Sequence, residues 1–175
     1  MAIATLFTQS DFVGSIKLDF GSYSDFTDFA AQVQDEYLRK LLGFELYYDY
    51  DQNQGTTKYD NLEDGIAAGY DESGVKKELR GLKKMLPYFF YFKYQLDLQS
   101  FQTTISEFEG IAENATKTDL TRPTLTKNMV LAYNEGLAMY DELINYITLQ
   151  RTEQGDSYYP GFLPTYLTQQ NTFGI

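Results

Sequence analysis

Residues 74–100 read GVKKELRGLKKMLPYFFYFKYQLDLQS. Apolar side chains recur in this stretch at roughly the spacing of an α-helix, which predicts one long helix with one face turned inward. The positions are Val75, Leu79, Leu82, Leu86, Phe89 or Phe90, and Leu96. Because Pro87 lacks an N–H and its ring collides with the carbonyl one turn back, we expect a kink there, or a helix that restarts at this residue. The pattern is typical of the central helix of a small helical domain.

The two halves of this stretch differ in character. The first half carries the only basic cluster of the sequence, which comprises Lys76, Lys77, Arg80, Lys83 and Lys84. The second half is almost entirely aromatic from Pro87 to Tyr94, so it must be covered by other helices or by another subunit. Because the chain has a net charge of −11, we expect the basic cluster to pair with acids on an adjacent helix or subunit rather than with DNA.

Helices are predicted on both sides of the central stretch. The first follows an N-cap at Ser22 or Ser24 and ends before Gly43, with acids in its first turn and bases in its last. A short helical piece over 44–48 comes after it. The last long helix, Thr124–Gln150, contains Gly136, which indicates close packing against a neighbouring helix.

Other segments lack a helical period. Residues 49–73 are polar and Gly-rich, which predicts a long connection. Residues 102–122 predict a protruding loop with a hairpin-like excursion, and such loops usually carry contacts. Its contact residues would be Ile105, Phe108 and Ile111. Near the start of the chain we expect a short helix around Asp11–Val13, capped by Thr8 or Ser10, and a strand or extended link over 16–20.

The last segment, Ser157–Ile175, carries large apolar side chains and no charged residue. It is too apolar for a solvated disordered tail, so it must dock. Folded back, it would cover the core of its own subunit; extended, it would form an arm on a neighbour. We favour the arm, because exposed apolar segments at a terminus usually mark an interaction site. Its contacts would be Tyr159, Phe162, Leu163, Tyr166 and Phe173.

Together these patterns predict an all-α fold, a small bundle of three to four main helices with a protruding loop and an extended C-terminal arm. We expect a helical domain over residues 1–151 and the arm over 152–175. The first residues lack the basic leader of a signal peptide, and no stretch approaches the ~20 apolar residues of a membrane span.

Composition narrows the chemistry. The chain has no Cys and no His, which removes thiolate nucleophiles, the commonest general base and the commonest transition-metal ligand. The acidic run that starts at Asp49 has the wrong register for an EF-hand, because position 6 is Gln54 and position 12 is Asp60. Adjacent acids on a helix diverge by about 100°, so they do not form a hydrolytic pair. We expect no enzymatic activity, no cofactor and no metal site.

Three features of the chain resemble one protein family. They are QDEYLRKLLGFELYYDY at 34–50, the predicted helix GLKKMLPYFFYFKYQLDLQ with the TTISEFEGIAENAT loop after it, and a last helix rich in Tyr and Asn. The pattern is similar to helical head–tail connector (adaptor) proteins of tailed bacteriophages, particularly phages of Bacteroides-like hosts. In that family the first helix ends in Y-L-x-x-L-L-G-x-E-L-Y, which matches residues 37–47 here. The resemblance spans roughly residues 25–150.

This resemblance implies a virion structural protein at the capsid–tail junction, made in the host cytoplasm. Such proteins form a homo-oligomeric ring, typically twelve-fold, beneath the portal protein. They extend the channel through which double-stranded DNA passes without sequence-specific binding, and they dock tail or other connector proteins. Two alternatives remain from the residues alone. One is a helical adaptor or inhibitor that binds a single host protein, and the other is a metal-dependent enzyme that uses only carboxylates.

Overall fold

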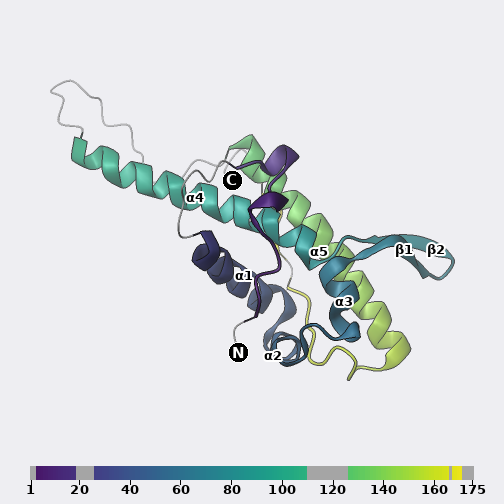
Figure 1. Ribbon diagram of the computed structural model, residues 1–175. Coiled ribbons are helices and arrows are strands. Elements are labelled where there is room, and N and C mark those ends of the chain that lie inside the picture. The colour runs from purple at the N-terminus through teal and green to yellow at the C-terminus, as the bar shows by residue number, and fades with distance from the viewer. Residues whose placement is uncertain (1–2, 19–25, 110–125, 166, 171–175) are drawn as a thin grey trace.

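Most of the chain is helical. The computed structural model describes residues 3–18, 26–109, 126–165 and 167–170, with the backbone alone for 99–109. Figure 1 shows the two long helices, α4 and α5, lying against each other with the shorter helices packed around them. The helices are α1 (Phe26–Leu42), α2 (Phe44–Asn53), α3 (Thr57–Asp64), α4 (Leu82–Glu109) and α5 (Lys127–Gln154).

The fold is not all-α, because two strands form an antiparallel hairpin, β1 (Ile66–Glu72) and β2 (Val75–Leu79). The prediction of one helix from residue 74 onward is therefore wrong for its first part. Ser73 and Gly74 both have positive φ, 54° and 80°, and they join the paired residues Glu72 and Val75. Two residues with positive φ are the signature of a tight hairpin turn, and this local geometry overrides the helical spacing of the side chains.

Two glycines fix the base of this hairpin. Gly65 ends α3 and Gly81 precedes α4, and their φ values are 76° and 82°. A Cβ atom on Gly65 would lie 2.3 Å from the carbonyl oxygen of Leu79, and one on Gly81 would lie 2.4 Å from the backbone nitrogen of Gly65. Only glycine allows this close approach of two backbones.

The predicted connection over 49–73 is also wrong. Helix α2 continues to Asn53, and α3 and β1 account for most of the residues between α2 and the hairpin turn. The helical piece predicted over 44–48 is confirmed and is longer than expected. The predicted end of the first helix before Gly43 is also confirmed. Helix α1 ends at Leu42, and Gly43 has a positive φ of 75°, which glycine adopts readily at a helix end.

Helix α4 runs without interruption through Pro87, so the expectation that the helix restarts at this residue is wrong. It continues to Glu109, and the first part of the loop predicted over 102–122 is therefore helical, while residues 110–122 lie outside the described chain. Near the N-terminus the short helix appears as a 3-10 turn, Gln9–Asp11, whose Asp11 carboxylate accepts from the Thr8 N–H at 2.7 Å. A second 3-10 turn, Gly14–Ile16, stands where the strand over 16–20 was expected to begin.

The core lies between α1, α4 and α5. Phe89 of α4 is fully buried and stacks on Tyr37 of α1 with 4.6 Å between ring centroids. On its other side a Cβ atom at Gly136 of α5 would lie 3.1 Å from two carbon atoms of the Phe89 ring. The close helix packing predicted at Gly136 is confirmed.

A buried amide ties the N-terminal segment to this core. Gln34 is 1% exposed, and its side chain accepts from the Leu6 N–H at 2.7 Å and donates to the Ala4 carbonyl at 2.9 Å. Buried polar groups need such partners, so Gln34 fixes where the first residues cross α1.

Candidate functional site

The C-terminal segment returns to the body of its own subunit. Tyr159 is fully buried and Phe162 is 2% exposed, and both belong to the core cluster of the chain. The Tyr159 hydroxyl donates to the Lys58 carbonyl at 2.9 Å, and Arg151 of α5 donates to the Phe162 carbonyl at 2.8 Å. The extended arm favoured from the sequence is therefore wrong for residues 156–165, which fold back on their own subunit.

A charged and aromatic cluster surrounds this contact. The Lys58 ammonium pairs with the Asp49 carboxylate, which also accepts from the Tyr59 hydroxyl. The same ammonium lies 4.9 Å from the Tyr59 ring centroid and 5.7 Å from that of Tyr159. Burial opposes ionisation of Asp49, but the hydrogen bonds from Lys58 and Tyr59 outweigh it and lower the pKa of the carboxyl. Burial raises the pKa of the Tyr159 phenol far above its usual range.

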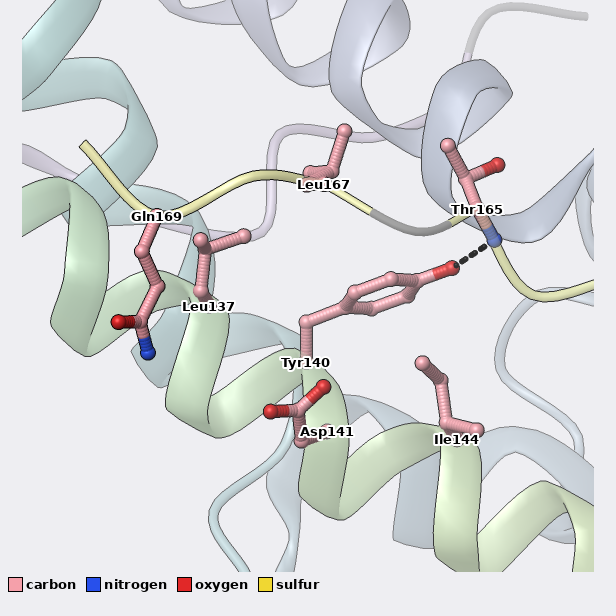
Figure 2. Close-up of a pocket in the computed structure, with 7 residues that line it drawn as sticks. All are labelled: Leu137, Tyr140, Asp141, Ile144, Thr165, Leu167 and Gln169. Carbon is pink, nitrogen blue, oxygen red and sulfur yellow. Dashed lines mark hydrogen bonds between the residues drawn. The ribbon is translucent and has the colours of Figure 1, made fainter. Parts of the chain in front are cut away.

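A small pocket lies farther along the same segment, between α5 and residues 165–169 (Figure 2). Its volume is about 120 Å³, well below the ~300 Å³ of the smallest typical ligand sites. The Tyr140 hydroxyl beside it donates to the Leu41 carbonyl at 2.7 Å and accepts from the Thr165 N–H at 3.0 Å. A hydroxyl bonded on both sides holds the segment in place and is not poised as a nucleophile. The lining comprises Leu137, Tyr140, Asp141, Ile144, Thr165, Leu167 and Gln169.

Two members of the basic cluster, Arg80 and Lys83, pair with acids on neighbouring elements, as the sequence indicated, whereas Lys77 pairs with Glu72 within the hairpin. Arg80 forms a fork with Glu142 of α5, with 2.9 Å and 2.6 Å from Nε and Nη2 to Oε1, and it also pairs with Glu135. These hydrogen bonds raise the pKa of Arg80. Lys83 lies 2.6 Å from the Asp64 carboxylate. Arg80 and Lys83 therefore fasten the base of the hairpin to α3 and α5.

A different set of apolar side chains is left uncovered by the described chain. Phe44 is 79% exposed and Tyr48 is 60% exposed, one turn apart on α2, whereas Leu46 and Tyr50 on the other side of that helix are fully buried. Leu163 is 76% exposed. It follows Gly161, whose backbone lies directly against the Glu45 side chain at the start of α2. We call Phe44, Tyr48 and Leu163 the α2 patch.

The residues proposed from sequence as contacts fall into four groups. Leu163 is exposed, as an interaction residue must be, while Tyr159 and Phe162 are used within the subunit. Positions 105 and 108 lie on the last part of α4 rather than on a loop. Ile111, Tyr166 and Phe173 lie outside the described residues. Sequence reasoning missed Phe44 and Tyr48, although apolar residues on both faces of one short helix were a signal for them.

The chain matches no protein-family profile, no curated protein and no solved structure. Among the described residues, no cluster of three or more acids has the arrangement of a metal site. Within that same part of the chain, none of the helices combines the length and apolar character needed to span a membrane.

Proposed function

We propose that this chain is a structural subunit of a virion, a head–tail connector that forms a ring beneath the portal, extends the DNA channel and docks the tail. The observation that carries the proposal is the presence of two dissimilar exposed regions. The α2 patch is one, and the hairpin that projects from the body with Val75 56% exposed is the other (Figure 1). Rings require two different complementary surfaces on every subunit.

The charge of the chain and its likeness to phage connectors add support. A net charge of −11 offers few cations to DNA phosphates, so an acidic channel would let DNA slide without adhering. The residues matched to the connector pattern, 37–47, include the end of α1 and the start of α2, where the α2 patch lies. We place the assembled protein in the virion and assign it no catalytic role.

Native mass spectrometry and electron microscopy of the purified chain test this proposal, alone and mixed with the portal protein encoded in the same genome. We expect closed rings with a central opening, or binding of many copies to the portal. A chain that stays monomeric in both samples overturns the proposal. A discrete one-to-one complex with a single host protein would instead establish the second candidate, a helical adaptor or inhibitor, which the exposed α2 patch also suits.

A further inference from the structure

The hairpin has an anchored base and a free end. At the base Arg80 bonds α5, and farther along β1 the Tyr70 ring, opposite Lys77 of β2, meets the Tyr146 ring edge-on at 5.2 Å between centroids. Toward the turn, Val75, Lys76, Lys77 and Glu78 are all exposed. A two-stranded sheet by itself is marginally stable in water, so a hairpin held out from the body gains from a surface that covers its end.

The hairpin end carries lysines, whereas α2 carries only acids. Helix α2 has three acids and no base. Residues 71–78 at the hairpin end have three acids and two bases, so this end has a net charge of only −1 in a chain of net charge −11. Lys77 lies 3.9 Å from Glu72, whereas for Lys76 the described residues supply only a weak bond to the Ala68 carbonyl at 3.5 Å. Two copies of so acidic a chain repel each other least where one of them presents its hairpin.

We infer that the hairpin end of one copy docks on the α2 patch of a second copy, with Val75 against Phe44 and Tyr48, and with Lys77, on the same face of β2 as Val75, toward Glu45. This inference rests on the proposed function and names its subunit contact. The hairpin and α2 lie on different sides of the molecule (Figure 1), so the contact joins two chains rather than two parts of one. Because the two surfaces differ, the contact repeats head to tail and closes into a ring when the rotation permits.

The absence of cysteine from the chain allows a direct test by disulfide cross-linking. The double variant F44C/V75C should form a ladder of covalent oligomers under mild oxidation, because a disulfide requires the two Cβ atoms to lie within about 4.5 Å. The matched control is L131C/V75C, since Leu131 on α5 is 54% exposed and Val75 is 56% exposed. We expect the control to give no ladder. Equal ladders, or no ladder from F44C/V75C, overturn the inference.

A charge exchange provides a second test that leaves the apolar residues in place. E45K alone and K77E alone should each raise the apparent dissociation constant of the oligomer about tenfold, and E45K/K77E should restore it. The matched neutral variants E45Q and K77Q should have smaller effects. Weakening without restoration by the double variant overturns the pairing of Lys77 with Glu45.

The two proposals fail in distinguishable ways. If the wild-type chain forms rings but the F44C/V75C ladder does not appear, the subunit contact lies elsewhere and the connector function stands. If the wild-type chain remains monomeric with and without portal protein, both proposals are wrong.

Discussion

Two aromatic regions of this chain have opposite fates. Residues 158–162 end in the core, where Tyr159 is fully buried against α3, while Phe44 and Tyr48 on α2 are left in solvent. Both regions are rich in tyrosine and phenylalanine, and composition does not distinguish them. What separates them is whether the subunit has a partner for each ring: Tyr159 has the Tyr59 ring at 5.8 Å and a carbonyl acceptor. Aromatic richness therefore indicates a surface that must be covered, without saying by which molecule.

The largest expected effect is on the free energy of unfolding, which should depend on the buried aromatic region and not on the exposed one. Tyr159→Ala should lower the free energy of unfolding by about 3–5 kcal/mol, because it leaves a cavity and removes the hydrogen bond to the Lys58 carbonyl. Phe44→Ala should change it by less than about 0.5 kcal/mol, because the ring is exposed. Urea unfolding followed by circular dichroism, at a protein concentration low enough that the chain is monomeric, measures both.

A conservative variant refines this test. Tyr159→Phe keeps the ring and removes only the hydroxyl, so the loss should be about 1 kcal/mol. If Tyr159→Ala lowers the free energy of unfolding as little as Phe44→Ala does, residues 158–162 are not part of the core in solution. The extended arm predicted from the sequence would then be the better description.

The second prediction compares the base of the hairpin with its end. Arg80→Met should cost roughly 2 kcal/mol, because it leaves the partly buried carboxylates of Glu142 and Glu135 facing each other without a cation. Lys76→Met, at the exposed end, should cost less than about 0.5 kcal/mol. The same unfolding experiment reports both, and equal losses would show that the base is not the anchor.

The sequence predicted the helices well wherever local signals agreed. Gly43 follows the end of α1 and Gly136 allows the contact with Phe89, and both were recognised. The strands were missed because apolar spacing over 75–82 suits a helix, whereas the decisive signal was the Ser73–Gly74 turn between residues that pair. The approach of Gly65 to Gly81 joins positions far apart in sequence, and no local pattern encodes it.

The candidate surface was less accessible to sequence reasoning. An apolar terminus predicts docking, but whether Tyr159 meets its own Lys58 or a neighbour depends on the tertiary position of α3. The sequence places Phe44 and Tyr48 in a short helical piece, but it does not say which side of that helix faces the core. The burial of Leu46 and Tyr50 decides this and leaves Phe44 and Tyr48 on the exposed side.

The third prediction concerns the tightest packing in the core. Gly136→Ala should gain about 1 kcal/mol from helix propensity and lose about 2 kcal/mol from crowding of Phe89, which Tyr37 blocks on its other side. We therefore expect a net loss of about 1 kcal/mol in the free energy of unfolding.

A double-mutant cycle separates the two effects. In a Phe89→Leu background the ring is gone, so Gly136→Ala should become stabilising by up to about 1 kcal/mol. If Gly136→Ala destabilises both backgrounds equally, Phe89 is not the neighbour that requires glycine.

The smallest expected effect tests the cluster that holds residues 158–159. Because the folded state lowers the pKa of Asp49, ionised Asp49 stabilises the fold above the ordinary carboxyl pKa of about 4, and this contribution is lost as the pH falls through the lowered value. Asp49→Asn should therefore cost ~0.2–1 kcal/mol at pH 7 and almost nothing near pH 2. Urea unfolding at a series of pH values measures the difference.

In a Lys58→Met background the pH dependence of that difference should shrink, since the cation that favours the carboxylate is absent. A difference that stays constant with pH would mean that Asp49 does not hold the cluster through its charge.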